Sequence, residues 1–371
     1  MPMKEKRISL RFREDNEIDM KVWQLLENAA KEKNASKNSI VIELMLSALE
    51  HKNSEDALAE RIAEMVADKL SGMAFQSEAT RGRPGSKHML EFFEKRKNDE
   101  IKLPESINLT QDLSYVNDAE TILISINSQG LRKFLEELKN YNIKKKIIVL
   151  CMKGIEVETG NRLSQIVESA VDNSNSIAVW LGPGHVQEFY DGIPNCMVID
   201  SYDEKAKNYL VEQFSSDLIR FYLGEDMIGN EIGAATKNVI GIAGGMLDGL
   251  HLSSLKGALM ARGTKEVSRL IKAMGGNELS AYGLCHLGDY EATIFSKYSH
   301  NRQFGEQFVE GLVYAKLAEG YYTVKALMRL KDMYQVELPI CEAVYRILYE
   351  HHDPQNELNF LFQRKIKSEI S

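Results

Sequence analysis

Isolated cysteines and histidines are the first side chains of this sequence that could bind a metal or act as nucleophiles. Four cysteines are present: Cys151, Cys196, Cys285 and Cys341. They lie far apart, and no Cys-x-x-Cys pair occurs, so neither a zinc site nor a disulfide framework is indicated. The adjacent His351 and His352 are interpreted as solvated surface rather than as a metal pair. Such isolated cysteines are typical of proteins in the reducing cytoplasm, where we expect this chain to work.

The first residues of the chain predict a strand with one polar face. Its polar residues are Arg7, Ser9 and Arg11, and they alternate with Ile8, Leu10 and Phe12. This two-residue period gives one apolar and one polar face. Two helices follow within residues 1–53, the second capped at Ser36. Because a lone strand leaves both edges unpaired and fifty residues make a thin core, we expect this module to dimerise through the strand.

The next segment, residues 54–86, connects this module to the rest of the chain. Residues 54–71 have an apolar stripe at helical spacing, which predicts an amphipathic helix. That helix either packs against the protein or in a short coiled coil, or it docks on a partner. Residues 72–86 have the Gly, Ser and Pro content of a linker.

From about residue 87 the pattern changes to apolar runs separated by helical segments. Five runs are strand-like: 121–126, 145–151, 176–182, 195–201 and 219–224. Such alternation predicts an α/β domain with a parallel sheet over 87–224. After Gly224 the strand pattern stops, and long helical patterns predict an all-α domain over 225–371.

Length and charge exclude several classes of protein. The 371 residues suggest two to three domains at about 150 residues each. No apolar run reaches the roughly 18–20 residues of a membrane span, and the charged start lacks a signal-peptide stretch, so we expect neither membrane insertion nor export. The net charge of -8 argues against a protein that coats nucleic acid along its whole surface, but leaves room for a local basic site.

Seven short blocks occur in order between about residues 81 and 367. They are 152–156, 181–183, 233–239, 287–289, 299–305, 319–320 and 339–345. This ordered set resembles the bacterial NAD(P)-dependent glycerol-3-phosphate dehydrogenase family. The resemblance implies a Rossmann domain followed by a helical substrate domain. It also implies reversible reduction of dihydroxyacetone phosphate to sn-glycerol 3-phosphate, with NAD or NADP as cofactor, for glycerophospholipid synthesis.

The glycine-rich turn that normally opens a Rossmann domain is absent from this sequence. No Gly-x-Gly-x-x-Gly motif precedes residue 81, although such glycines let the backbone approach the cofactor pyrophosphate. The Gly82-Arg83 pair matches the family's Gly-Arg at the end of the second strand, where Arg83 would bind the adenosine end. We therefore expect an incomplete Rossmann-type sheet whose first strand and glycine loop are replaced by residues 1–80.

The resemblance assigns the chemistry to a few residues. Lys237 matches the family's general acid and base, and Lys153 matches a second lysine that contacts both substrate and cofactor. Asp289, which we also count as catalytic, and Thr293 match positions that orient Lys237 and the substrate. A lysine in this role must lose its proton near neutral pH, which requires burial or a nearby positive charge. We expect Lys153, Lys237 and Asp289 to converge around one pocket.

The remaining site residues also come from the resemblance. Substrate-binding positions are Lys153, Gly182, Gly184, Asn238, Thr293, Ser299, His300 and Asn301. Cofactor-binding positions are Arg83, Lys153, Val186, Arg302, Leu317 and Glu319. Two positions depart from the family: His300 replaces an arginine that binds the substrate phosphate, and Gly184 replaces a serine. Two histidines are left open: His185 either lines the cleft or lies outside it, and His286, beside Asp289, either belongs to the site or packs in the core.

A second, shorter resemblance concerns residues 1–53, which are similar to ribbon-helix-helix proteins such as plasmid partition proteins and small repressors. It implies a homodimer whose two-stranded ribbon reads DNA bases through Arg7, Ser9 and Arg11. The alternative function is therefore a DNA-binding or partition adaptor that carries a non-catalytic dehydrogenase-like domain. A further alternative is that the change of character at residues 81–86 marks an artificial junction or a recombination scar.

Overall fold

The computed structural model describes residues 103–104, 106–366 and 368–369. The chain divides into two units, residues 1–79 and 80–371, and every described residue belongs to the second. The predicted N-terminal module, the amphipathic helix, the linker and Arg83 lie outside the described residues. The same holds for the candidate DNA-binding side chains of Arg7, Ser9 and Arg11.

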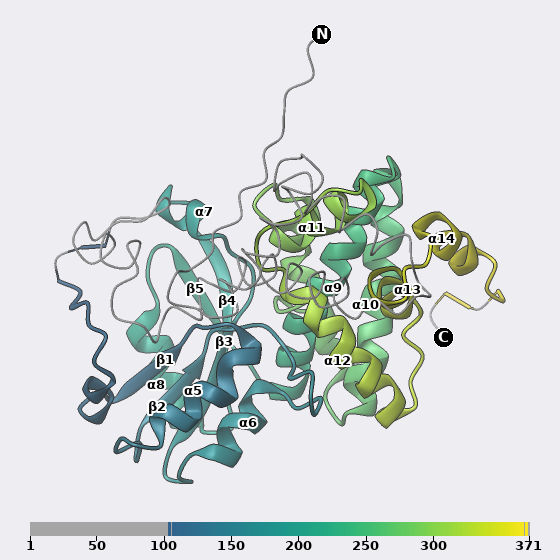
Figure 1. Cartoon of the computed structure of the whole chain (residues 1–371). Coiled ribbons are helices and arrows are strands. Elements are labelled where there is room, and N and C mark those ends of the chain that lie inside the picture. Colours follow the sequence, from purple (N-terminus) through teal and green to yellow (C-terminus); the bar gives the residue numbers. More distant parts are fainter. Residues whose placement is uncertain (1–102, 105, 367, 370–371) are drawn as a thin grey trace, which may run out of the picture. The chain divides into compact units, whose positions relative to one another are not determined.

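A five-stranded sheet forms the first half of the described chain, in the order β1-β2-β3-β4-β5 (Figure 1). The strands are β1 (Thr121–Ile124), β2 (Ile147–Leu150), β3 (Ser176–Leu181), β4 (Asn195–Ser201) and β5 (Ile219–Leu223). Each strand lies within one of the five predicted apolar runs. Such near-continuous apolar strands are expected where helices cover both faces of a sheet.

The sheet is not parallel throughout, which corrects the prediction of a parallel sheet. β1, β2 and β3 are parallel, but β4 pairs antiparallel to β3, and β5 is parallel to β4. A parallel pair needs a crossover that contains a substantial helix. The connection from β3 to β4 contains only α7 (Val186–Tyr190), so the chain turns back along its neighbour instead.

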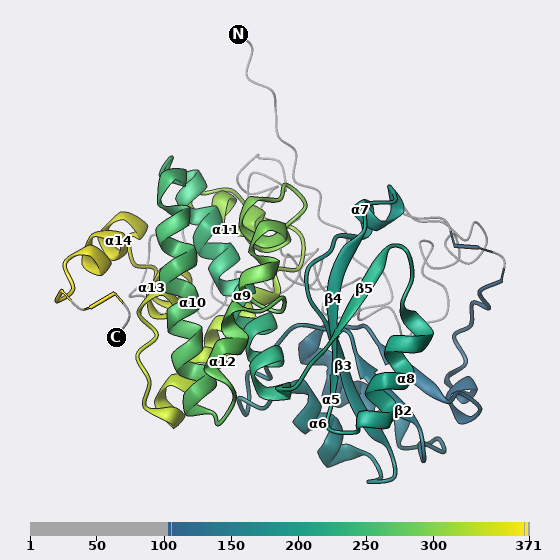
Figure 2. The same cartoon turned by 180° about the vertical axis from the view of Figure 1, so that it is seen from behind.

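Helices cover the two faces of this sheet. On one face α5 (Leu131–Leu138) and α6 (Leu163–Ala170) pack with Ile148, Leu150 and Val179. On the other face α8 (Glu204–Phe214) packs with Val149 and Ala178. Figures 1 and 2 show these helices on opposite sides. The alternation of side chains along each strand produces the two faces.

A long buried helix, α9 (Met227–Gly249), is the centre of the helical half. Nearly all of its residues up to Leu247 are buried, as expected for a helix that other elements surround on every side. The helices of this half beyond α9 are α10 (Lys256–Ala273), α11 (His300–Val309), α12 (Glu319–Tyr334), α13 (Pro339–Tyr349) and α14 (Pro354–Phe362). Except for α14, all of these pack on α9. The strand-to-helix change predicted at Gly224 therefore falls between β5 and α9.

Several short turns complete the described chain. They are η2 (Leu113–Asn117), η3 (Ser128–Gly130), η4 (Ser253–Leu255), η5 (Glu278–Tyr282), η6 (Leu287–Asp289) and the π turn η7 (Glu291–Phe295). η6 and η7 lie between α10 and α11 and face α9. None of the helices in the described ranges is long and apolar enough to cross a bilayer.

Candidate active site

Two lysines and one aspartate meet where the sheet adjoins the helical half. Lys153 follows β2, Lys237 lies in the middle of α9, and Asp289 ends η6. Asp289 Oδ2 lies 2.6 Å from Lys153 Nζ and 3.0 Å from Lys237 Nζ. The three side chains that were expected to converge are therefore brought together by one carboxylate oxygen. Lys153 Nζ also donates to the carbonyl oxygen of Gly182, directly after β3.

The surroundings of Lys237 lower its pKa toward neutral pH. The side chain is buried, and burial lowers the pKa of Lys237 to about 8. The carboxylate of Asp289 opposes this shift, whereas the ammonium of Lys153 adds to it. A group with a pKa near the working pH can both donate and accept a proton. The arrangement therefore provides a proton donor and acceptor beside a fixed positive charge.

A threonine fixes the direction of the Lys237 ammonium group. Lys237 Nζ donates to Thr293 Oγ1 at 2.6 Å, and Thr293 Oγ1 donates in turn to the carbonyl oxygen of Asp289 at 2.6 Å. Thr293 lies in the π turn η7, whose wider helical turn is a common feature of functional sites. The threonine thus connects the lysine to the same segment that holds the aspartate.

A fully buried histidine, whose role the sequence left open, attaches this segment to α9. His286 Nδ1 lies 2.9 Å from the carbonyl oxygen of Gly233, and Tyr290 Oη lies 2.7 Å from His286 Nε2. Because a carbonyl only accepts, Nδ1 carries the hydrogen and Nε2 accepts from the tyrosine. Burial lowers the pKa of His286 to about 4, so the ring stays neutral. His286 therefore sets the position of the Asp289 segment.

Asn301 and Glu319 join three parts of the fold near the lysines. Asn301 Nδ2 donates to Asn238 Oδ1 at 3.1 Å, and Asn301 Oδ1 accepts from the backbone N–H of Gly320 at 2.9 Å. Glu319, the first residue of α12, accepts from the backbone N–H and the hydroxyl of Ser128 after β1. These bonds hold α9, α11 and α12 against the carboxyl end of the sheet.

The residues at the start of α11 have separate partners. Ser299 caps the helix, because its Oγ accepts from the backbone N–H of Arg302. His300 Nδ1 lies 2.5 Å from Tyr314 Oη. The Arg302 guanidinium is bound by Asp248, at 2.5 Å, and by Glu306, at 3.1 Å. The structure thus places the candidate cofactor contact Arg302 among carboxylates of its own chain.

The segment after β3 explains one departure from the family. Gly184 has a φ of +142°, and a Cβ there would lie 2.6 Å from the ring of Phe189. A serine would therefore be strained in this backbone and would collide with that ring. His185 follows, and its Nε2 lies 2.8 Å from the carbonyl oxygen of Ala292, next to Thr293. Of the remaining candidates, Val186 begins α7 and Leu317 is half-buried before α12.

Polar residues after β1 were missed by the sequence analysis. Asn127 is buried, and its Nδ2 has no hydrogen-bond partner within the part of the chain that the structure describes. Ser128 follows and binds Glu319. Both residues stand at the carboxyl end of a parallel strand, where open α/β sheets bind their ligands. The signal that could have found them was their place immediately after the apolar run 121–126.

Known proteins resemble this chain over most of its length. Two family models match: the NAD-dependent glycerol-3-phosphate dehydrogenase N-terminus over residues 57–207 and the C-terminus over residues 226–359. The glycerol-3-phosphate dehydrogenase [NAD(P)+] of Clostridium botulinum (strain Alaska E43 / Type E3) is 35% identical over 288 residues, which is 74% of this chain and 87% of that protein. That of Fusobacterium nucleatum is 36% identical over 286 residues, or 74% of this chain and 85% of that protein.

A solved structure agrees with these sequence matches. The crystal structure of glycerol-3-phosphate dehydrogenase from Coxiella burnetii superimposes with a TM-score of 0.71 and 28% identity, covering 75% of this chain and 89% of that one. The N-terminal match begins at residue 57, within the segment predicted as helix and linker. The chain belongs to the NAD-dependent glycerol-3-phosphate dehydrogenase family.

Proposed function

We propose that this chain catalyses reversible hydride transfer between NAD(P)H and dihydroxyacetone phosphate, giving sn-glycerol 3-phosphate. The observation that carries the proposal is the buried Lys237, held between Asp289 and Thr293 with a pKa of about 8. Relatives named for this activity share about a third of their residues with the chain. The buried lysine supplies the proton that a reduced ketone needs.

Lys237 moves the proton of the reaction. In the reducing direction the Lys237 ammonium gives one proton to the substrate's carbonyl oxygen as that oxygen gains negative charge. In the oxidising direction the neutral amine takes the same proton from the hydroxyl. Asp289 holds the ammonium group in place, and Lys153 keeps a second positive charge beside the oxygen. Fixed charges of this kind stabilise an oxyanion without reorganising water.

The carboxyl end of the sheet fits a nicotinamide cofactor. Asn127, Lys153 and Gly182 follow β1, β2 and β3 at this end, and Asn127 Nδ2 is a buried donor without an acceptor among the described residues. By family resemblance Val186, Arg302, Leu317 and Glu319 would help to hold the cofactor. When bound, the cofactor supplies or accepts the hydride. Glu319 is held ready for this role by Ser128.

The substrate phosphate is proposed to bind at the start of α11. Ser299, His300 and Asn301 lie there, and the first N–H groups of a helix favour an anion. His300 provides a single donor rather than the bidentate fork of an arginine. We therefore expect weaker phosphate binding than an arginine would give, and a KM for dihydroxyacetone phosphate that falls in His300→Arg.

Turnover measured with the purified full chain tests the function. Oxidation of NADH or NADPH should follow the addition of dihydroxyacetone phosphate, and Lys237→Ala should abolish it. Lys144→Ala, which changes an exposed lysine before β2, is the matched control and should leave the rate unchanged. An intact chain that shows no turnover above a buffer blank at millimolar cofactor would refute the proposal.

For residues 1–53 we propose a ribbon-helix-helix module that makes the chain a homodimer and binds DNA. The support is the alternation of Arg7, Ser9 and Arg11 with apolar residues. A DNA duplex should be retarded in a salt-sensitive way, because phosphate contacts release counterions. Retardation that is unchanged in the double variant Arg7→Ala and Arg11→Ala would exclude this ribbon.

We also propose that the chain works in the cytoplasm. All four cysteines are free thiols, and Cys285 and Cys341 are buried. Free thiols persist where glutathione and thioredoxin keep proteins reduced. Cell fractionation followed by detection of the full chain tests this location.

A further inference from the structure

A cavity of about 840 Å³ lies in the helical half, between α9, α10, α13 and α14. None of the residues named above for proton transfer or for the cofactor lines it. Cavities of roughly 300–1,000 Å³ with mostly apolar walls are typical of small-molecule sites. The chemistry of its walls therefore indicates which ligand it would take, independently of the proposed dehydrogenase activity.

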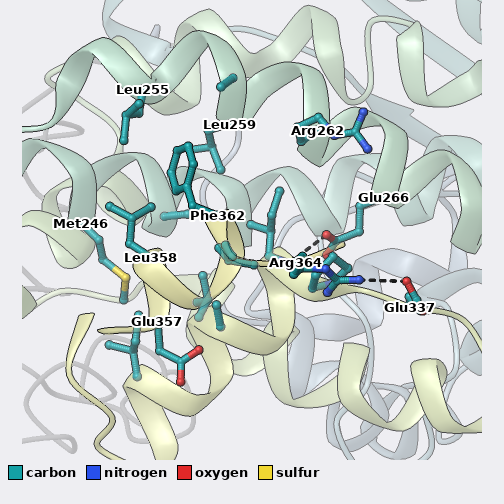
Figure 3. A pocket seen from close by; sticks show the side chains of 18 of the residues that line it. Met246, Leu255, Leu259, Arg262, Glu266, Glu337, Glu357, Leu358, Phe362 and Arg364 are labelled. Carbon is teal, nitrogen blue, oxygen red and sulfur yellow. Dashed lines mark hydrogen bonds and ion pairs between the residues drawn. The ribbon is translucent and has the colours of Figure 1, made fainter. Parts of the chain in front are cut away.

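One end of the cavity is apolar. The side chains that point into it are Met246 of α9, Leu255 of η4, Leu259 of α10, and Leu358 and Phe362 of α14 (Figure 3). Leu358 and Phe362 stand four residues apart on one face of α14, yet Leu358 is only half-buried and Phe362 is 68% exposed. An apolar helix face of this kind is normally buried against a partner. This end is thus suited to aliphatic carbon.

The other end is charged, as the labelled side chains in Figure 3 show. It carries Arg262, Arg269 and Arg364 against Glu266 and Glu337. Arg364 forms an ion pair with Glu337 at 2.9 Å. Arg262 and Arg269 each donate to a backbone carbonyl oxygen, of Glu369 and Glu337, and a carbonyl does not neutralise their charge.

Glu266 adds little negative charge to that end. It is fully buried and accepts from the backbone N–H groups of Ile340 and Cys341 at the start of α13. Burial raises the pKa of Glu266 to about 7, so near neutral pH a large share of this side chain is protonated. The charged end therefore has a net positive charge.

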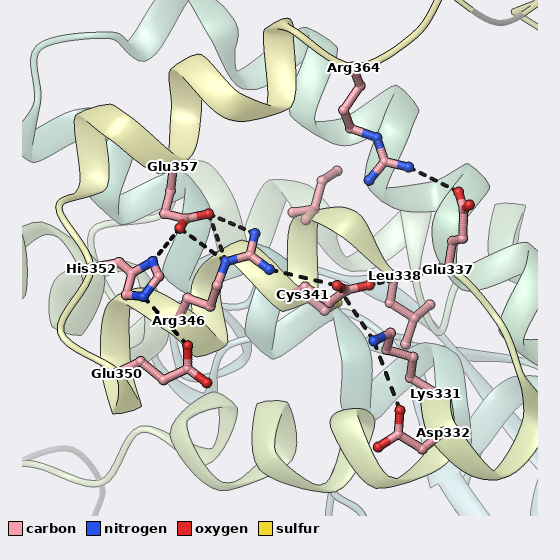
Figure 4. A network of polar contacts seen from close by, with 12 residues as sticks. Lys331, Asp332, Glu337, Leu338, Cys341, Arg346, Glu350, His352, Glu357 and Arg364 are labelled. Atoms are coloured by element: carbon pink, nitrogen blue, oxygen red, sulfur yellow. Dashed lines mark hydrogen bonds and ion pairs between the residues drawn. The ribbon is translucent and has the colours of Figure 1, made fainter.

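The helix that closes the cavity is fixed to its neighbour by a separate network. Glu357 of α14 is bound by Arg346 of α13 at 2.7 Å and by His352 at 2.7 Å (Figure 4). Its carboxylate is thus neutralised outside the cavity, although Glu357 lines the apolar end. These contacts hold α14 in a position where its apolar face lies opposite α10, with the cavity between them.

We propose that this cavity binds a single-chain aliphatic amphiphile with an anionic head. The aliphatic chain lies between α10 and α14 against Leu255, Leu259 and Leu358. The head meets Arg262 and Arg364 at the charged end. Carboxylate and phosphate heads share this chemistry, because both accept paired hydrogen bonds from a guanidinium.

Isothermal titration calorimetry on the full chain tests the proposal, with probes kept below their micelle concentrations. Sodium dodecanoate should bind saturably, one molecule per chain, and dodecyltrimethylammonium, with the opposite head charge, should bind at least about tenfold more weakly. Dodecyl phosphate distinguishes the source of the head: tighter binding than dodecanoate indicates a phosphate ester, and weaker binding a carboxylate. Equal binding of both head charges would overturn the proposal.

Paired variants locate the site. Ala258→Trp fills the apolar end and should weaken dodecanoate binding at least about tenfold, whereas Ala261→Trp, on an exposed position of α10 outside the cavity, should not. Arg262→Glu should weaken binding similarly, and Arg220→Glu on the exposed side of β5 serves as its charge control. Unchanged binding in Ala258→Trp would overturn the proposal. A second result would also overturn it: dodecanoate does not bind, and light scattering shows a dimer of the wild type that dissociates in Ala258→Trp. A second copy of the chain would then occupy the cavity.

Discussion

Lys237 combines burial with two opposite charges, and the result is a pKa of about 8. Below that pH the ammonium form predominates, and above it the neutral amine does. We expect the rate of ketone reduction to fall as pH rises through about 8, because the proton donor is lost. The rate of alcohol oxidation should rise over the same range, because the acceptor appears. Rates measured in both directions between pH 6 and 10 check these slopes.

The variant Lys237→Arg separates this lysine from other titrating groups. Arginine keeps the positive charge but holds its proton at every accessible pH. We expect a loss of about 10²–10⁴-fold in kcat and no break near pH 8. Lys144→Arg, at an exposed site, is the control. A break near pH 8 that survives in Lys237→Arg at an undiminished rate would assign the proton to another group.

If Lys237 transfers the proton as proposed, Thr293 should act on the reaction through its hydrogen bond to Lys237. In Thr293→Val the ammonium group loses its 2.6 Å partner while the shape of the side chain is nearly kept. One lost hydrogen bond to a charged group, about 1.5–3 kcal/mol, predicts a kcat lower by about ten- to a hundredfold. The pKa of Lys237 should fall further, which moves the break in the pH profile to lower pH. Thr293→Ser should restore both the rate and the break, whereas a purely structural role would leave the break in place.

The sequence predicted which side chains converge better than it predicted the residues that hold them. Lys153, Lys237 and Asp289 stand in motifs, and in the structure both lysines contact one carboxylate oxygen of Asp289. His286 and Asn127 had no motif of their own. Their importance comes from contacts between segments far apart in the chain, such as the bond from His286 to Gly233. Spacing along a single sequence does not contain that information.

At the level of elements, the contact between α9 and α11 places Ser299, His300 and Asn301. A Cβ on Gly245 of α9 would lie 1.9 Å from the carbonyl oxygen of Arg302, so the two helices touch through backbone. Gly245→Ala must push α11 away. We expect it to destabilise the fold by about 1–3 kcal/mol and to raise the KM for dihydroxyacetone phosphate.

Gly257→Ala is the matched control for this helix contact. Gly257 lies in α10, and a Cβ there would meet nothing within 4 Å. Alanine in an open helical position should stabilise by about 0.5–1 kcal/mol. Urea denaturation of both variants checks the opposite signs. Equal effects from the two glycines would mean that α9 and α11 tolerate separation.

A buried ion pair joins the sheet side to α9. Arg162, which caps α6, pairs with Glu231 of α9, and Ser164 donates to the same carboxylate. Glu231→Ala leaves the Arg162 charge buried and should cost about 3–5 kcal/mol in unfolding free energy. Arg132→Ala breaks the half-exposed pair with Glu156 and should cost only about 0–1 kcal/mol. Comparable losses in the two variants would contradict the role given to burial.

The apolar runs predicted where the strands lie but not which way they run. Each run contains its strand, yet the direction of β4 depends on the connection from β3, which holds only the short α7. A run of buried residues looks the same in a parallel and an antiparallel strand. Likewise, the helical patterns after Gly224 predicted an all-α domain, but the cavity beside α14 depends on how α10 and α13 pack.

In the described molecule as a whole, the site exists only while the sheet and the helical half stay together. Glu319 to Ser128, Lys153 to Asp289 and Arg162 to Glu231 all cross that boundary. Each of these contacts has an ionised or ionisable member. The free energy of unfolding is therefore expected to depend on pH, and one buried carboxyl makes a separable contribution.

That carboxyl is Glu266, whose pKa is raised by burial from 4.5 to about 7. The folded state holds this proton more tightly than the unfolded chain, so the stability that the proton provides is present below about pH 4.5 and lost as pH rises through about 7. A shift of two to three pKa units corresponds to on the order of 3 kcal/mol in the free energy of unfolding.

The variant Glu266→Gln tests this contribution. It keeps an acceptor for the N–H groups of Ile340 and Cys341 but cannot ionise. In urea denaturation the variant should therefore lose less stability than the wild type between pH 5 and 8, whereas Glu310→Gln, at an exposed site, should follow the wild type. If the free energy of unfolding changes equally with pH in Glu266→Gln and the wild type, Glu266 is ionised in the folded state at both pH 5 and pH 8. The N–H groups of Ile340 and Cys341 would then stabilise the charged carboxylate.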